Sequence, residues 1–279
     1  MSTTEQRPIR RAAVFLGVTV GLSLLVFWGP LALFRIPAIG FTTDTRGPIW
    51  AIVLFIVGGF TPSLVAIGMT WVTEGRAAVG SLLRRVVRFR IGLRWYAILV
   101  GTVIVATAAQ FAIMRLLGQR FDLSRFVAQI GSLLPLIVLG PLSEELGWRG
   151  YALDRLQVKF SPLATSLIVG VAWGIWHLPL FFIPGSTQAE SNFPFVGFLV
   201  GVTALSIIFT WAHNNTGGSI WTAVFFHWVY AYSLEVTGTG VERSPLYNWL
   251  EYTPYILIAV VVALATRARG PRVGQVRAA

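Results

Sequence analysis

The sequence contains no cysteine, few charged residues and only three histidines in 279 residues. Without cysteine, disulfides and thiolate chemistry are excluded, and any metal would need histidine and carboxylate ligands. Charged residues make up 12% of the chain, against about 25% in soluble domains. Hydrophobic residues make up 55%, above the usual range of about 45–50%. An apolar excess spread along most of the chain indicates membrane spans rather than one large soluble core.

Apolar runs of about 20 residues, the length that crosses a bilayer, recur through the chain. They predict an all-α, polytopic bundle of about eight transmembrane helices. The expected spans are 13–34, 49–72, 95–116, 133–153, 163–182, 195–211, 220–236 and 252–266. We therefore expect a single transmembrane domain over 12–269, with disordered cytoplasmic tails at 1–11 and 270–279.

The net charge of +11 reflects where the arginines and lysines lie in this topology. Sixteen of the 22 lie at the end of the bundle that holds both termini, and six lie at the other end. Because basic residues accumulate in cytoplasmic connections, both termini are expected in the cytoplasm. This arrangement accounts for the basic composition with membrane lipids as partners and without nucleic acid.

The longest polar connection, near 76–94, has an amphipathic pattern. Valines and leucines recur at helical spacing, with Arg84, Arg85 and Arg88 on the opposite face. This pattern predicts a helix in the headgroup layer whose arginines face anionic lipid. A segment whose positive charges only fix the topology of the chain, with no further role, would have the same pattern.

Two adjacent carboxylates, Glu144 and Glu145, lie within the expected span 133–153. At 1.5 Å per residue, Glu144 falls roughly 16 Å from the outer end of that helix, near mid-bilayer. Ionisable groups at that depth are costly and usually mark a functional interior. Glu145 and Arg149 are four residues apart and can form an ion pair. Glu144 points elsewhere and is left to act as a general base.

The three histidines differ in their surroundings. His177 and His227 lie in apolar runs without polar partners on their own helices, so each needs a partner from another span. The glutamate pair is the obvious supplier, although each histidine could instead make only an interhelical hydrogen bond. His177 is expected roughly 8 Å from the outer end of its span, and His227 nearer the middle. His213, beside Asn214 and a Gly-Gly pair, is interpreted as a solvated loop residue.

Three sequence blocks together resemble the CAAX prenyl protease and bacteriocin-processing (CPBP) family of intramembrane proteases. The first contains Glu144-Glu145-x-x-x-Arg149, the second Trp173-x-x-x-His177, and the third His227 on a late helix. Supporting runs are Gly147-Trp148-Arg149-Gly150-Tyr151, Trp176-His177-Leu178-Pro179-Leu180-Phe181 and Thr216-Gly217-Gly218-Ser219. The resemblance covers a core at about 133–233.

This resemblance implies hydrolysis of membrane-bound or lipidated (CAAX-like) peptides. It implies that Glu144 and His177 activate the attacking water and that His227 stabilises the oxyanion, with Glu145 as a further member of the site. The family's second oxyanion donor, an asparagine four residues after the last histidine, is replaced by Ala231. Tyr230, Tyr232 or Ser233 could substitute for it. Otherwise, the chain is a catalytically impaired member acting as a membrane immunity or interaction protein.

Metal dependence is a separate question, because family members are often labelled metalloproteases. Glu144, His177 and His227 could hold zinc. However, the chain has no His-Glu-x-x-His helix, and the three side chains come from separate spans. A glutamate-based site without a metal is favoured. A transporter that relays protons through the same residues is disfavoured, because no inverted repeat is visible. The protein is expected in a bacterial or archaeal cell membrane.

Overall fold

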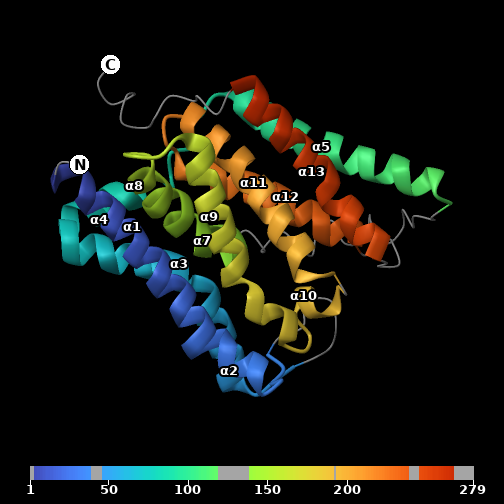
Figure 1. The fold of residues 1–279 in the computed structure, drawn as a ribbon, viewed down its shortest axis with the longest axis horizontal. Helices are drawn as coiled ribbons and strands as arrows, with labels where there is room; N and C mark the ends of the chain where they lie inside the picture. The colour runs from blue at the N-terminus through green and yellow to red at the C-terminus, as the bar shows by residue number, and fades with distance from the viewer. Residues whose placement is uncertain (1–2, 39–45, 119–137, 192, 239–244, 267–279) are drawn as a thin grey trace.

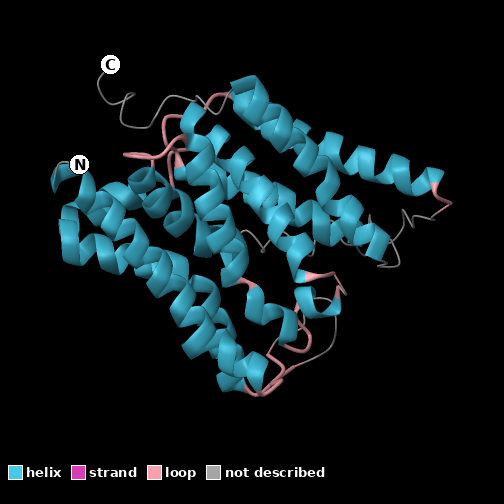
Figure 2. Ribbon diagram, viewed as in Figure 1, coloured by secondary structure: helices cyan, strands magenta, loops and turns pink. Residues whose placement is uncertain are grey.

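The computed structural model describes residues 3–38, 46–118, 138–191, 193–238 and 245–266. These residues form helices joined by short turns and contain no β-strand (Figure 2). The predicted all-α fold is therefore confirmed.

The helices follow one another as a bundle (Figure 1). In chain order they are α1 (Thr3–Leu22), α2 (Trp28–Leu33), α3 (Ile49–Glu74), α4 (Arg76–Arg84), α5 (Leu93–Leu116), α7 (Ser143–Gly147), α8 (Asp154–Leu156), α9 (Pro162–Trp176), α10 (Thr187–Glu190), α11 (Phe195–Asn215), α12 (Ile220–Gly238) and α13 (Pro245–Thr266). Single π-helical stretches lie at Ser23–Phe27, Val138–Leu142 and Trp148–Leu153, and a 3-10 turn lies at Leu178–Phe182.

Six described helices are long and apolar enough to cross a membrane, which makes the chain an integral, multi-pass membrane protein. They are Gln6–Leu33, Ile49–Glu74, Leu93–Leu116, Pro162–Phe182, Phe195–Asn215 and Tyr247–Thr266. The expected seventh span corresponds to α12. The expected fourth corresponds to the continuous helical segment 138–156, and its first residues lie outside the described ones.

Two local expectations need correction. Residues 3–11 were expected to be disordered, but α1 begins at Thr3, and Arg11 is held by Glu74 on α3 at 3.1 Å. The expected tail 270–279 lies outside the described residues. The amphipathic helix near 76–94 is present as α4 but ends at Arg84, and α5 begins at Leu93 after Gly92, whose φ is 87°.

The segment that carries the glutamates is the most deeply buried part of the bundle. Every residue from Ser143 to Leu153 is buried. The close approach of α7 to α3 depends on Gly147, where a Cβ atom would lie 2.4 Å from the Pro62 carbonyl oxygen. Charged side chains on such a segment cannot reach solvent, so they must find partners inside the protein.

The helix α9 has clear start and stop signals. Ser161 caps its N-terminus by accepting a hydrogen bond from the Ala164 amide at 3.2 Å, and Pro162 occupies the first turn. The helix ends at His177 because Pro179 cannot continue the hydrogen-bond pattern. α9 packs closely along α11, where a Cβ at Gly174 would collide with Leu199. These signals place His177 at the end of α9 remote from Ser161.

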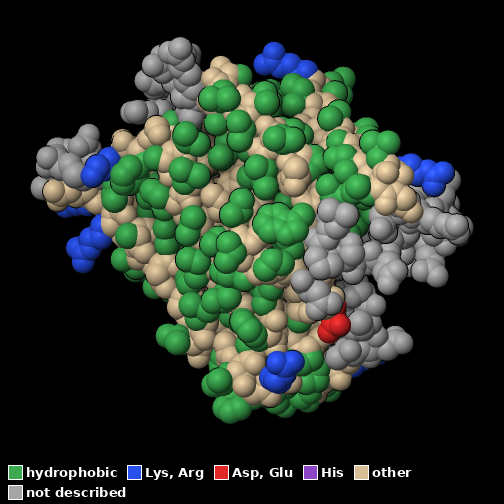
Figure 3. All heavy atoms as spheres, turned by 45° about the vertical axis from the view of Figure 1, so that its right-hand side comes forward, with side chains coloured by type: hydrophobic (Ala, Val, Ile, Leu, Met, Phe, Trp, Pro, Cys, Tyr) green, Lys and Arg blue, Asp and Glu red, His purple; other side chains and the backbone are tan. Residues whose placement is uncertain are grey.

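The outside of the bundle is apolar. Aliphatic side chains of α5 and α13 are exposed, among them Ile104, Val105, Val261 and Leu264. Figure 3 shows one face covered largely by hydrophobic side chains, with arginines and lysines near its periphery. An exposed apolar surface of this extent is what a lipid-facing protein presents.

Candidate active site

Glu145 is the centre of a buried ion-pair network. Both of its carboxylate oxygens lie 2.9 Å from Nη1 of Arg149, one helical turn away. The side chains of both residues are fully buried. The guanidinium of Arg149 also lies over the rings of Phe209 and Trp173, at 4.1 and 4.7 Å from their centroids. The charge of Glu145 is therefore balanced inside the protein by a cation that is itself held by aromatic faces.

Glu145 also holds the histidine of α12. The Glu145 Oε1 atom lies 2.8 Å from Nδ1 of His227. A carboxylate oxygen accepts this hydrogen bond, so Nδ1 carries the proton. One carboxylate therefore joins two helices, by pairing with Arg149 and by orienting the ring of His227.

Glu144 faces a different partner. Trp173 of α9 donates a hydrogen bond from its indole Nε1 to Glu144 Oε2 at 2.6 Å. The backbone oxygen of the same tryptophan lies 2.8 Å from Nδ1 of His177. A carbonyl oxygen can only accept, so His177 is protonated at Nδ1. Trp173 thus links Glu144 to His177 through its indole and its backbone.

The two histidines share one cavity. It has a volume of about 180 Å³, and Trp173, His177 and His227 line it. The other lining residues are Phe181, Thr187, Gln188, Ser191, Phe193, Phe198, Val202, Tyr230, Ala231, Leu234, Asn248, Glu251 and Tyr252. Glu144 is not itself a lining residue, but it accepts a hydrogen bond from Trp173, which is. In the described part of the chain, neither histidine makes a hydrogen bond through Nε2.

This geometry brings together all the residues that the sequence marked as candidates. Glu144, Glu145 and Arg149 come from 143–153, His177 from the end of α9 and His227 from α12. The five side chains are joined through Trp173 or Glu145. Their catalytic roles stay predictions.

Comparisons with known proteins agree with the sequence blocks. Residues 125–233 match the family model described as type II CAAX prenyl endopeptidase Rce1-like. The CAAX prenyl protease 2 of Methanococcus maripaludis is 38% identical over 98 residues, which is 34% of this chain and 36% of that protein. The matched segment contains the glutamate pair and both cavity histidines.

Over residues 125–233 the chain is similar to the CAAX prenyl endopeptidases of the CPBP family. As in the family pattern, the glutamates and both histidines fall within the matched segment. One wall of the cavity comes from α13, beyond that segment, and consists of Asn248, Glu251 and Tyr252. The protein therefore builds part of its cavity from residues that the family match does not cover.

The favoured absence of a zinc ion at this site stays a prediction. Within the described residues, no three histidine, aspartate or glutamate side chains are grouped closely enough to hold a metal ion. Glu144 accepts a hydrogen bond from an indole, and Glu145 is engaged by Arg149 and His227.

The cavity includes Ala231, the position at which the sequence departs from the family pattern. Ala231 lines the cavity, and its methyl group cannot donate a hydrogen bond. Three residues were considered from the sequence as replacements for the missing oxyanion donor. Of these, only Tyr230 lines the cavity. Ser233 donates to the Tyr230 carbonyl at 2.7 Å. Asn248, which the sequence did not single out, also lines the cavity and donates to the Ser191 carbonyl at 2.6 Å.

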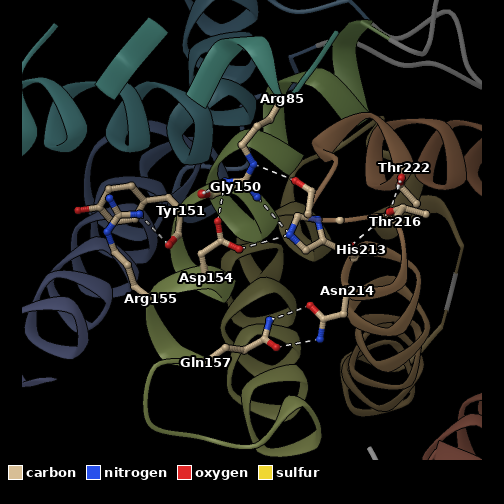
Figure 4. A network of polar contacts seen from close by, with 12 residues as sticks. Arg85, Gly150, Tyr151, Asp154, Arg155, Gln157, His213, Asn214, Thr216 and Thr222 are labelled. Atoms are coloured by element: carbon tan, nitrogen blue, oxygen red, sulfur yellow. Dashed lines mark hydrogen bonds and ion pairs between the residues drawn. The ribbon is translucent and has the colours of Figure 1, made fainter. Parts of the chain in front are cut away.

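His213 is not the solvated loop residue expected from the sequence. It is fully buried near the end of α11, where Nε2 lies 3.2 Å from Arg85 Nη2 and 3.3 Å from Asp154 Oδ1 (Figure 4). Arg85 also contacts Asp154 at 2.5 Å and the Gly218 carbonyl at 2.8 Å. Arg85 therefore turns into the protein instead of facing lipid. We call Arg85, Asp154 and His213 the helix-end network.

Burial alone would raise the pKa of the Asp154 carboxyl. The Arg85 guanidinium and the His213 ring outweigh burial and lower that pKa below its ordinary value of 3.8. No sequence pattern indicates this network, because its members are 59 to 128 residues apart.

Proposed function

We propose that this protein is an intramembrane endopeptidase that hydrolyses peptide bonds of membrane-bound or lipidated (CAAX-like) substrates. The observation that carries the proposal is the cavity: two histidines line it with Nε2 atoms that bond to nothing in the described chain, and Trp173 joins it to the Glu144 carboxylate. The match to the CAAX prenyl endopeptidase family and to a protein named CAAX prenyl protease 2 supports the same reaction class.

In the proposed reaction, a water molecule attacks the carbonyl carbon of the scissile peptide bond. Glu144 takes one proton from that water as its oxygen bonds to carbon. The neutral His177, protonated at Nδ1, offers the lone pair of Nε2 to orient the same water. The proton then passes to the amide nitrogen as the C–N bond breaks, which yields a free carboxylate and an amine.

The negative oxygen of the tetrahedral intermediate needs donors. His227 can supply one from Nε2 when both ring nitrogens are protonated, and the Glu145 carboxylate at Nδ1 is the counter-charge for that state. Tyr230 is the proposed second donor, because it lines the cavity next to Ala231 and carries a hydroxyl group. Glu145 thus positions His227, while Arg149 keeps the buried carboxylate balanced.

The test is cleavage of a panel of lipidated and transmembrane peptides by the purified protein in detergent, with products identified by mass spectrometry. We expect wild type to cleave at least one peptide and Glu144→Gln to lose about 10²–10⁴ in rate. Glu74→Gln, the same change at a partly exposed ion pair outside the cavity, is the matched control and should retain activity. Products that form equally with Glu144→Gln would reject the proposed mechanism.

The alternative is a catalytically impaired CPBP protein that acts as a membrane immunity or interaction factor. Ala231 favours it, because losing one oxyanion donor can cost about 10²–10³ in rate. In that case no peptide of the panel is cleaved by wild type, while Ala231→Asn gains activity. Elemental analysis of the same preparation, with and without chelator treatment, tests the proposed absence of a catalytic metal.

A further inference from the structure

A second cavity lies apart from the candidate active site, with a volume of about 540 Å³. Its walls come from α1, the end of α3, α4 and the segment 150–158. Figure 1 shows α1, α4 and α8 together at the end of the bundle where the chain begins. We call it the arginine cavity, because Arg11, Arg85 and Arg155 line it. Volumes of about 300–1,000 Å³ are typical of small-molecule sites, and the proposed reaction does not use this one.

The arginine cavity has a surplus of positive charge. Its charged lining residues are three arginines and two carboxylates. Glu74 pairs with both Arg11 and Arg155 through the same oxygen. Asp154 pairs with Arg85 (Figure 4). The side chains in these pairs are only 15–33% exposed, so water and salt screen their charges less than at an open surface. An anion that enters the cavity is therefore attracted.

Two of the lining arginines have hydrogen-bond donors to spare. Arg11 donates from Nη1 to Glu74 and from Nη2 to the Thr73 carbonyl. Arg155 donates from Nη1 to the Tyr151 carbonyl and from Nη2 to Glu74. A guanidinium also carries an Nε–H donor. Among the described residues, the Nε–H groups of both arginines make no hydrogen bond and stay available to a ligand.

Neutral polar groups belong to the same walls. No side chain caps the N-terminus of α4, and its first turn contains no acidic residue. Ala78 of that turn lines the cavity. The N–H groups of a first helical turn have no partner within the helix and favour anions. On the α3 wall, the Thr70 hydroxyl is buried and makes no hydrogen bond within the described chain. These donors together suit a ligand with several anionic oxygens.

The depth of the cavity in the bundle matches the headgroup layer of a membrane. The apolar span that contains α1 begins at Gln6, and the span formed by α3 ends at Glu74. Arg11 joins these two span ends by its ion pair with Glu74. The ends of spans lie where lipid headgroups lie. Trp71 and Val72 of α3 are exposed beside this level, and they offer an apolar surface to the chains of a lipid.

We propose that the arginine cavity binds a phosphate group, supplied by the headgroup of an anionic phospholipid or by free phosphate. Phosphate fits the forked N–H groups of arginine and accepts several hydrogen bonds at once. Its oxygens take the Nε–H donors of Arg11 and Arg155 and N–H groups of the first turn of α4. The inference is independent of the proposed protease function, because the two cavities share no lining residue.

Thermal unfolding of the full chain in detergent tests the proposal, because a ligand of the folded protein raises the midpoint. Inorganic phosphate is titrated against chloride at equal ionic strength. Dioleoylphosphatidylglycerol in mixed micelles is titrated against dioleoylglycerol, which lacks the phosphate. We expect a saturable rise with a phosphate probe and none with its control. A rise with inorganic phosphate supports the proposal with free phosphate as the ligand, and a rise with the phospholipid alone supports it with the headgroup as the ligand.

Two matched pairs of variants locate the binding. Ala78→Leu fills the cavity without changing its charge, and Ala77→Leu makes the same change at an exposed position that does not line it. Arg11→Gln removes a lining arginine, and Arg10→Gln removes an exposed arginine on the same helix. We expect Ala78→Leu to lose the saturable rise and Arg11→Gln to weaken the apparent affinity by about tenfold to a hundredfold. Ala77→Leu and Arg10→Gln should bind as wild type does.

The absence of a saturable rise in wild type with either phosphate probe would overturn the proposal. Equal binding by the two members of a pair would also overturn it, because the phosphate would then bind outside the arginine cavity. If Ala78→Leu does not fold, the comparison of Arg11→Gln with Arg10→Gln decides the result alone.

Discussion

The bundle contains two buried polar clusters whose hydrogen bonds are arranged differently. The cavity cluster consists of Glu144, Glu145, Arg149, His177 and His227. The helix-end network consists of Arg85, Asp154 and His213. In the helix-end network, the same nitrogen of His213 contacts both the arginine and the aspartate, and Arg85 is further engaged by backbone carbonyls. In the cavity cluster, each histidine is held by Nδ1 alone and turns its other side to a cavity.

The difference shows how similar side chains can either join helices or leave polar atoms open to a cavity. Charged groups in an apolar bundle must be paired, and both clusters satisfy that demand. The helix-end network uses its polar atoms to join helix ends. In the cavity cluster the two carboxylates have different partners. Glu145 pairs with Arg149, and among the described residues Glu144 accepts a hydrogen bond only from the Trp173 indole. The carboxylate of Glu144, which has no cation of its own in the described part of the chain, is therefore the one available for proton transfer.

Removing Arg149 should have the largest effect on stability in the cavity cluster. Arg149→Met keeps the side-chain bulk but leaves Glu145 as a fully buried charge without its cation. Breaking one half of a buried pair costs about 3–5 kcal/mol. We expect a much lower thermal midpoint in detergent and lost activity. A midpoint equal to that of wild type would show that the pair is not structural.

Tyr230 tests whether the cavity cluster has a complete set of oxyanion donors. Tyr230→Phe should lower the turnover number by about 10²–10³ if its hydroxyl replaces the family asparagine. Adding Ala231→Asn to that variant should restore most of the rate. Steady-state kinetics on one peptide measure both changes. An unchanged rate in Tyr230→Phe would assign the donor to another lining residue, such as Asn248.

Asp154 tests the helix-end network. Asp154→Asn should cost about 2–3 kcal/mol of stability, less than a fully buried pair because both partners are slightly exposed. Since the folded-state pKa of Asp154 lies below its ordinary value of 3.8, its contribution is complete above that ordinary value and is lost as the pH falls through the folded value. Thermal unfolding between pH 7 and pH 3 should therefore show an acid-dependent loss in wild type that is smaller in Asp154→Asn. Equal pH dependence would contradict the assignment.

Replacing Trp173 should have the smallest effect, and one confined to the cleavage rate. Trp173→Phe keeps an aromatic ring beside His177 but removes the indole donor to Glu144. A hydrogen bond to a charged group contributes about 1.5–3 kcal/mol. We therefore expect the cleavage rate to fall by about tenfold or more. The thermal midpoint should change little. A rate equal to that of wild type would show that the carboxylate is positioned without the indole.

The sequence predicted the cavity cluster better than its surroundings, for physical reasons. Helical spacing alone places Glu145 beside Arg149, and burial in an apolar run marks His177 and His227. The link through Trp173 joins residues 29 apart in the chain, and no periodicity reports such a contact. His213 was misread because Asn214 and the glycines after it are typical of solvated turns, whereas Arg85 arrives from a distant segment to cover it. The α13 wall of the cavity also depends on tertiary packing.

The most direct test of the account compares Glu144→Gln with Glu145→Gln, two identical changes at neighbouring positions. Each variant is purified in detergent, and both the cleavage rate and the thermal midpoint are measured. We predict that Glu144→Gln loses about 10²–10⁴ in rate while its midpoint stays close to that of wild type. Glu145→Gln should lower the midpoint sharply, because Arg149 is then a buried charge without a partner. Equal effects of the two changes on rate and midpoint would contradict the division of roles.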